Sequence, residues 1–317
     1  MTIGGYFELE LKQGHEYHPE ALKLNTGRNA FEYVLIANKY RKVYLPFYTC
    51  KSMLEPIKKL KLDYSFYSID KNFYPKIDFN VIQNKEVLVY TNYFGICDKQ
   101  VYVTTSMTNN LVIDNSQAFF SKPLPTVDTF YSPRKFFGLP DGAYLYTDNH
   151  LDIELEHDIS LNRFQHLLGR IDFCAEEFFH SFKSNEKNLS DQPINLMSNI
   201  TRRFLKSIDY NWIMNRRRAN FFYLHEKLEK TNSISFNLID DFVPMVYPYF
   251  IKQGLKLRQK LIENRVFVAS YWPNVGPMVN KKSVEADFVQ NLVALPIDQR
   301  YGYKEMEYIF SLISKYA

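Results

Sequence analysis

The sequence predicts an α/β fold, in which a mostly parallel sheet lies between helices and is followed by a smaller α+β region. The chain has 317 residues, more than one compact core of usual size holds, which favours one large and one smaller domain. Over roughly the first 150 residues, short apolar runs alternate with helical stretches, the pattern of a parallel sheet covered by helices. Beyond that point longer helical stretches dominate.

In the first part, a helix is predicted over residues 29–40, entered through Asn25-Thr26-Gly27, where Thr26 or Asn25 can cap it. A second helix is expected over residues 51–62, because its apolar residues recur on one side. Short apolar runs predict the strands, at 43–46, 64–69, 87–90, 111–113, 126–131 and 143–147.

In the second part, helices are predicted at 198–208, 211–230, 254–264 and 304–316, and strands at 245–250, 266–268 and 292–295. The polar stretch 183–192 is expected to be a loop-like linker. We therefore place a large domain at residues 15–192 and a smaller C-terminal domain at residues 193–317, which also includes residues 1–14.

The composition limits the classes of function. Lys and Arg number 39 against 35 Asp and Glu, a net charge of +4, which does not indicate binding to nucleic acid or to an anionic membrane. Cys50, Cys97 and Cys174 are scattered, which is typical of free thiols in a reducing compartment. Residues 1–14 show no signal peptide and no apolar run is long enough to span a bilayer. A soluble cytoplasmic protein is expected.

Two residues carry the chemistry that we expect. Asp114 ends the apolar run Leu111-Val112-Ile113, and in open α/β sheets ligands bind at the carboxyl ends of strands. An Asx turn or a helix cap is the alternative interpretation. Lys135 stands between Pro133-Arg134 and Phe136-Phe137-Gly138, and apolar neighbours favour the free amine by lowering its pKa. A surface loop lysine is the alternative.

Gly27 is a weaker signal, at the expected start of a helix. Backbone N–H groups at such a start can hold a phosphate, although ordinary turn chemistry explains a single glycine better.

Several short motifs follow one another along nearly the whole chain. They are Asn25-Thr26-Gly27-Arg28-Asn29-Ala30, Leu45-Pro46-Phe47-Tyr48-Thr49-Cys50, Thr91-Asn92-Tyr93-Phe94-Gly95, Asp114-Asn115-Ser116-Gln117-Ala118, Ser132-Pro133-Arg134-Lys135, Pro140-Asp141-Gly142-Ala143 and Ala294-Leu295-Pro296-Ile297. Their order and spacing resemble the DegT/DnrJ/EryC1/StrS sugar aminotransferases, which depend on pyridoxal phosphate (PLP) and have the fold-type-I architecture. The resemblance implies a seven-stranded sheet in the large domain.

The resemblance also implies roles for individual residues. Lys135 would form the Schiff base with PLP and move the proton between substrate and cofactor. Asp114 would pair with the pyridine nitrogen, and Gln117 would hydrogen-bond the ring hydroxyl. Cys50 stands where relatives often carry a stacking aromatic, so ring stacking falls to Cys50 itself or to a nearby aromatic such as Tyr48 or Tyr93.

The phosphate would be held at Gly27, by the main-chain N–H groups of Arg28 and Asn29, and by Ser132. Relatives usually carry a serine five positions before the lysine, where this chain has Phe130, so the contact is assigned to Ser132. A polar residue of the partner subunit usually completes this site, because the resemblance implies a homodimer with active sites at the subunit interface. The candidate for that residue is Asn195.

Four other signals are given structural interpretations. His15-Glu16-Tyr17-His18 has no third ligand at metal spacing, so surface histidines and no metal are expected. Arg216-Arg217-Arg218 is interpreted as a solvated helix face rather than a nucleic-acid patch, and Cys174 as a core residue. Tyr271-Trp272-Pro273 could pack on a sugar or on the domain interface.

The sequence thus predicts a PLP-dependent aminotransferase. It would move an amino group from an amino acid, glutamate by resemblance, to a nucleotide-linked keto sugar in surface-polysaccharide or deoxyamino-sugar biosynthesis. One alternative is a PLP-dependent lyase or other non-transaminase of the same fold. Another is a non-catalytic binding or regulatory protein, for which Phe130 and Cys50 are the only support.

Overall fold

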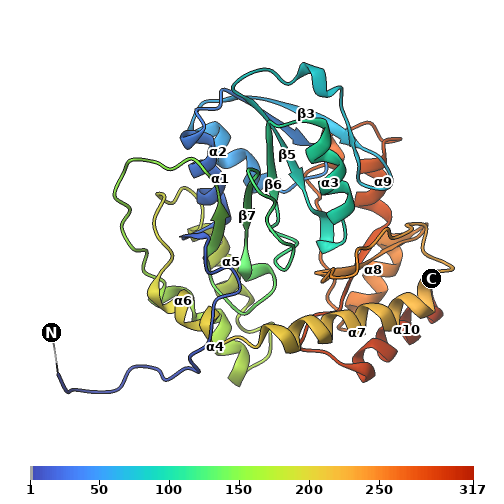
Figure 1. Ribbon diagram of the computed structural model, residues 1–317. Coiled ribbons are helices and arrows are strands. Elements are labelled where there is room, and N and C mark those ends of the chain that lie inside the picture. The colour runs from blue at the N-terminus through green and yellow to red at the C-terminus, as the bar shows by residue number, and fades with distance from the viewer. Residues whose placement is uncertain (1–2) are drawn as a thin grey trace.

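The architecture is described by a computed structural model covering residues 3–317, and it places a large twisted sheet at the centre of the molecule (Figure 1). The sheet has eight strands in the order β1-β8-β7-β6-β5-β2-β3-β4. They are β1 (Leu22–Leu24), β2 (Lys42–Pro46), β3 (Asp63–Ile69), β4 (Pro75–Lys76), β5 (Glu86–Thr91), β6 (Leu111–Asp114), β7 (Asp128–Tyr131) and β8 (Ala143–Tyr146). The predicted fold class is confirmed, with one strand more than expected.

The middle of this sheet is parallel and its two edges are antiparallel. Strands β3, β2, β5, β6 and β7 run parallel to one another, whereas β8 and β1 on one side and β4 on the other pair antiparallel to their neighbours. The carboxyl ends of the parallel strands therefore lie side by side along one end of the sheet. In such folds ligands bind at this carboxyl end.

Each face of the sheet has its own core. Val87 and Val89 of β5 pack with helix α1 (Gly27–Ala37) and its neighbour α2 (Leu54–Lys59). Leu88 and Tyr90 of the same strand point to the other face, toward α3 (Asp98–Met107) and the C-terminal region. Both sets are fully buried, which explains why the strand is a continuous apolar run rather than an alternating one.

The C-terminal region is built on long helices and a small two-stranded sheet. Helix α7 (Tyr210–Leu228) runs along the lower edge of the molecule in Figure 1, next to α10 (Tyr303–Tyr316). The remaining elements are α6 (Asn199–Lys206), β9 (Val246–Phe250), α8 (Gly254–Glu263), α9 (Val284–Asn291) and β10 (Leu292–Pro296). β9 and β10 form an antiparallel pair of their own.

Several parts of the chain differ from the sequence prediction. Residues 266–268 form no strand, and only a single bridge from Ala269 to Ala294 joins that segment to β10. The expected linker 183–192 is partly helical, because α5 (Phe179–Asn188) reaches into it. The helices α3, α4 (Gln165–Asp172) and α9 were not predicted. In α3, β-branched Val101, Val103 and Thr104 weaken the helix signal, and tertiary packing overrides it.

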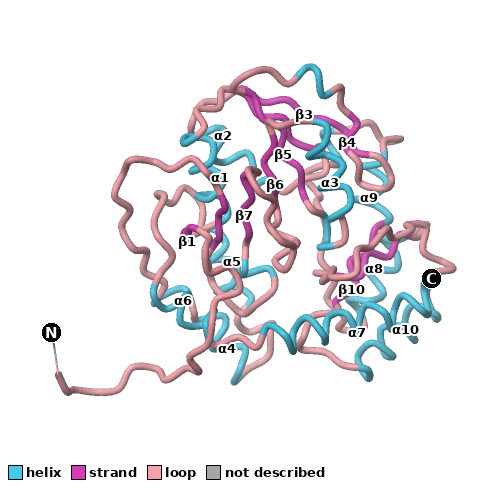
Figure 2. Tube along the Cα trace, in the orientation of Figure 1, coloured by secondary structure: helices cyan, strands magenta, loops and turns pink. Residues whose placement is uncertain are grey.

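The tube in Figure 2 shows the N-terminal segment as a loop that extends away from the body of the molecule before it reaches β1. Among residues 3–317, no helix is long and apolar enough to cross a membrane. The domain boundary at residue 192 stays a prediction.

Candidate active site

Lys135 lies in a tight turn at the carboxyl end of β7. The 3-10 turn Pro133–Lys135 is held by N–H groups of Lys135 and Phe136, which donate to the carbonyls of Ser132 and Pro133. Its side chain is exposed to solvent, yet many protein atoms lie around the amine. This burial, together with the charge of Arg134, lowers the pKa of Lys135 to about 8. The neutral amine is therefore far more populated near neutral pH than in an ordinary lysine.

Asp114 is the last residue of β6, one strand away from the lysine turn. Its Oδ1 accepts a hydrogen bond from the Ser116 N–H at 2.8 Å, so the Asx turn of the alternative interpretation does form. No donor reaches the other carboxylate oxygen from within the described residues 3–317. Burial raises the pKa of Asp114, whereas the Ser116 hydrogen bonds and the Lys135 charge lower it. The carboxylate and the amine thus belong to one electrostatic site.

The start of α1 faces the same site. Thr26 caps the helix by accepting the Asn29 N–H at 3.1 Å, so of the predicted phosphate donors Asn29 is already engaged. The N–H groups of Gly27 and Arg28 have no hydrogen-bond acceptor in the described chain, as is usual for the first N–H groups of a helix. A Cβ built on Gly27 would lie 3.7 Å from Ser132 Cβ and 3.9 Å from Ser132 Oγ. The structure therefore brings Gly27 and Ser132 together.

Gln117 is oriented by the loop that follows β5. Its Oε1 accepts the Phe94 N–H at 2.9 Å, and the residue is almost fully buried. Because the oxygen is engaged, the amide NH₂ is the group that remains to donate. That is the polarity needed to hydrogen-bond a ring hydroxyl oxygen.

Cys50 is the half-buried member of the three stacking candidates. It lies close enough to Lys135 for its sulfur to raise the pKa of that amine, and its Sγ accepts from Ser52 Oγ at 3.0 Å. Tyr48 and Tyr93 have no exposed surface and pack into the aromatic core, where the Tyr93 hydroxyl donates to the Tyr48 carbonyl. Of the three candidates, Cys50 is therefore the one with exposed surface.

The main chain of Asn195 lies close to the start of α1 in the same subunit. The Asn25 N–H donates to the Asn195 carbonyl at 2.9 Å, two residues before Gly27. Beside it, Asn29 Nδ2 donates to the Gln192 carbonyl at 2.8 Å. The segment leading to Asn195 is therefore tied to the start of α1, and its predicted contact with a partner subunit stays a prediction.

Sequence reasoning missed Ser116 and Arg217. Ser116 Oγ lies 3.9 Å from the Cβ position of Gly27, between the start of α1 and Asp114. Arg217 is 1% exposed, so the expected solvated face is wrong for this residue. It donates to the Phe136 carbonyl at 3.2 Å and to the carbonyls of Pro244 and Met245, which joins the lysine turn to the C-terminal region.

A signal for Arg217 was present in the sequence. It shares the buried stripe of α7 with Ile213, Asn220, Phe221 and Leu224, at spacings of three and four residues. A charge on that stripe needs partners, and here backbone carbonyls and the side chain of Gln299 supply them.

Two further interpretations are corrected. His18 is 2% exposed rather than on the surface, and its ring nitrogens contact the Phe119 carbonyl and the Tyr146 hydroxyl. Cys174 is exposed rather than in the core. Tyr271 and Trp272 pack against Phe94 and Tyr48, which favours an interface role. In the described residues no cluster of three His, Cys, Asp or Glu could hold a metal.

Comparisons with known proteins agree with this geometry at the level of the fold. The structure resembles a putative sugar aminotransferase of Streptococcus pneumoniae in its PLP form (TM-score 0.66, 13% identity, 94% of this chain and 88% of that chain). It also resembles a DegT DnrJ EryC1 StrS aminotransferase of Brucella abortus (0.63, 12%, 93% and 85%). A third is DesV of S. venezuelae, solved in complex with a ketimine intermediate (0.65, 13%, 93% and 84%).

No family model matches the sequence, and no curated protein matches it either. At such low identity the structural neighbours show the fold alone. The chain has the fold of sugar aminotransferases.

The residues present fit PLP. A phosphate suits the orphan N–H groups at the start of α1 with Ser132 beside them, and a protonated ring nitrogen suits the unpartnered oxygen of Asp114. The ring hydroxyl suits the Gln117 amide, and an aldehyde suits the Lys135 amine.

Proposed function

We propose that this protein is a PLP-dependent aminotransferase that transfers an amino group from an amino acid, with glutamate as the expected donor, to a nucleotide-linked keto sugar. The placement of Asp114 and Lys135 at the carboxyl ends of the neighbouring parallel strands β6 and β7 is the observation that carries the proposal. A lysine of lowered pKa and a buried carboxylate influence one another at the carboxyl edge of a parallel sheet. The fold shared with sugar aminotransferases supports the choice of substrate class.

When bound, PLP supplies an electron-accepting ring that stabilises a carbanion on the substrate. The chain supplies the rest. Lys135 Nζ, whose lowered pKa makes the neutral amine easier to reach, would accept a proton from the substrate carbon and return it. The Asp114 carboxylate would keep the ring nitrogen protonated, and the N–H groups of Gly27 and Arg28 with Ser132 would hold the phosphate.

We also propose a homodimer in which Asn195 serves the partner's phosphate site, and a cytoplasmic location. The free state of Cys50, Cys97 and Cys174 supports a reducing compartment. Phe130 stands where relatives usually carry a serine, and this difference gives little support to a non-catalytic role. The Phe130 ring is buried against Phe31 of α1 and is not turned toward the lysine.

The proposal is tested by spectroscopy on purified protein supplied with PLP. Wild type is expected to turn yellow and to lose that colour on addition of glutamate. Lys135→Ala should not develop the colour, whereas Lys122→Ala, a change at an exposed loop lysine, should behave as wild type.

Two results sink the proposal in different ways. Failure of wild type to take up PLP removes the catalytic role altogether. Uptake of PLP without any colour change across a panel of amino acids replaces the transaminase with a lyase or a binding protein.

A further inference from the structure

The N-terminal arm, residues 6–12, leaves its apolar side chains in water. From Phe7 to Lys12 apolar and charged residues alternate, so in an extended chain the two kinds of side chain point to opposite sides. Tyr6 is 99% exposed and Phe7 is 92% exposed, and Leu9 is exposed as well. Large apolar side chains gathered on such a short exposed segment indicate a surface that another molecule covers.

The arm is tied to α6 of its own subunit, and this contact directs it away from the C-terminal region. Glu8 pairs with Arg203 of α6, and a Cβ built on Gly14 would lie 2.6 Å from the carbonyl of Lys206, the last residue of that helix. In Figure 1 the arm leaves the body on the side opposite α8 and α10. Its apolar side chains are therefore free to pack on a second molecule.

A cavity on the C-terminal side of the molecule has the matching apolar chemistry. Its volume is about 940 Å³, and it lies between the segment of α4 and α5 on one side and residues 264–267 with α10 on the other. Phe179 and Phe267 line it, and both are more than half exposed although large and apolar. Lys135 does not line it. Aromatic walls of this kind suit the apolar side chains of a partner chain.

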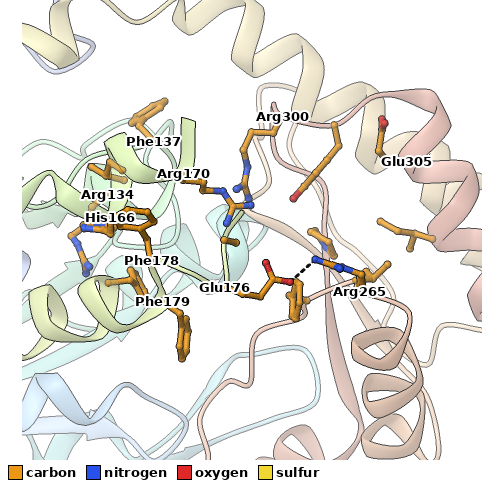
Figure 3. Close-up of a pocket in the computed structure, with 18 of the residues that line it drawn as sticks. Arg134, Phe137, His166, Arg170, Glu176, Phe178, Phe179, Arg265, Arg300 and Glu305 are labelled. Carbon is orange, nitrogen blue, oxygen red and sulfur yellow. Dashed lines mark hydrogen bonds and ion pairs between the residues drawn. The ribbon is translucent and has the colours of Figure 1, made fainter. Parts of the chain in front are cut away.

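The charges of the cavity and of the arm are opposite in sign. The arm carries two glutamates and one lysine, whereas the cavity lining holds four arginines, Arg134, Arg170, Arg265 and Arg300, against two glutamates, Glu176 and Glu305. Figure 3 shows Arg170, Arg265 and Arg300 extending into the space between α4 and the C-terminal segment. Arg265 pairs with Glu176, but Arg170 makes no ion pair within 4.0 Å among residues 3–317. Arg170 is thus the cation that the cavity leaves to a carboxylate of a partner.

We propose that the arm of one copy of the chain docks in this cavity of a second copy. Phe7 and Leu9 pack on the aromatic wall, and Glu10, on the opposite side of the extended arm, pairs with Arg170 of the other copy. Because each copy has both the arm and the cavity, two copies exchange arms in a closed pair. The proposal rests on the homodimer that is part of the proposed function, adds the contact that joins the two copies, and does not involve the chemistry at Lys135.

Photo-cross-linking of the full-length, PLP-loaded protein tests the contact. Phe7 is replaced by p-benzoylphenylalanine, isotope-labelled and unlabelled chains are allowed to exchange, and the peptides joined by illumination are identified by mass spectrometry. Cross-links should join a labelled to an unlabelled chain and should end in the cavity-lining segments 165–182 or 264–267. The same probe at Tyr102, a half-exposed residue of α3, is the matched control and should not reach these segments.

Charge reversal tests the ion pair, with sedimentation velocity as the measure of dimer affinity. Glu10→Arg and Arg170→Glu should each weaken the dimer about tenfold, the loss of a charge-assisted contact. The double variant should bind more tightly than either single variant, because the two reversed charges again attract each other. Arg41→Glu, an exposed arginine on another part of the chain, is the matched control and should sediment as wild type.

Cross-links confined to one chain overturn the proposal, because the arm then folds back on its own subunit. Cross-links to another surface, or none, also overturn it, and so do charge reversals that leave the dimer unchanged or a double variant weaker than both single variants. A dimer that persists in these cases leaves the proposed homodimer standing, whereas wild type that sediments only as a monomer removes both. The glutamate-dependent colour change, read on the same samples, reports separately on the proposed reaction.

Discussion

The lowered pKa of Lys135 gives a sharp pH prediction that does not depend on catalysis. At pH 7.5 an amine with a pKa of about 8 is neutral in about a quarter of molecules, whereas an ordinary lysine with a pKa of 10.5 is neutral in about one in a thousand. Pulse labelling of the PLP-free protein with acetic anhydride, followed by peptide mass spectrometry, reads this fraction directly. The labelling of Lys135 should rise with a midpoint near pH 8, and exposed lysines in the same digest serve as references.

Two substitutions should move that midpoint in opposite directions. The Arg134 charge lowers the pKa of Lys135, so Arg134→Gln should raise the midpoint. The Cys50 sulfur raises this pKa, so Cys50→Ala should lower the midpoint. A wild-type midpoint at or above pH 10, or shifts of the same sign in both variants, would refute the electrostatic account of the site.

Three further predictions concern stability, each measured by urea unfolding. Burial lowers the pKa of His18 from 6.5 to about 4, so the unfolded chain takes up a proton at this histidine before the folded protein does, and the free energy of unfolding falls as the pH drops below 6.5. By pH 4.5 the free energy of unfolding of wild type should have fallen by about 2–3 kcal/mol more than that of His18→Gln. Equal losses in the two proteins would contradict this. Arg217→Met leaves several buried carbonyls unpaired and should cost about 3 kcal/mol or more, against under about 1 kcal/mol for Arg216→Ala; similar costs would refute the tethering role. Gly95 has φ +68° and its Cβ would lie 2.7 Å from the Val243 carbonyl, so Gly95→Ala should cost at least about 1 kcal/mol, whereas Gly276→Ala, with nothing within 4 Å, should cost less.

The sequence was most informative where structure is local. Each parallel strand is a short apolar run, and the residues that end β6 and β7 follow directly from it, so Asp114 and Lys135 could be placed before any contact was known. The cap at Thr26 was readable for the same reason, since its bond spans three residues.

Contacts between distant segments were not readable. Arg217 and the Phe136 carbonyl are 81 residues apart, so nothing near either residue announces the bond. Helices α4 and α5 lie in a stretch with exposed apolar side chains such as Ile171 and Phe179, where no clear amphipathic pattern forms. Val266 to Val268 looked like a strand by composition, but β10 pairs with β9 and takes only one bridge from that segment.

The parallel strands also place the proposed active-site residues at one end of the sheet and the turns suited to chemical labelling at the other end. The proposed site residues after β2, β5, β6 and β7 gather at the carboxyl edge, so the turns at the opposite edge carry none of them. Asn84, Asn109 and Pro125 are exposed in those turns, just before β5, β6 and β7. They are the natural points for a fluorophore, an affinity tag or a surface linker, because a label there stands a full strand length from the lysine.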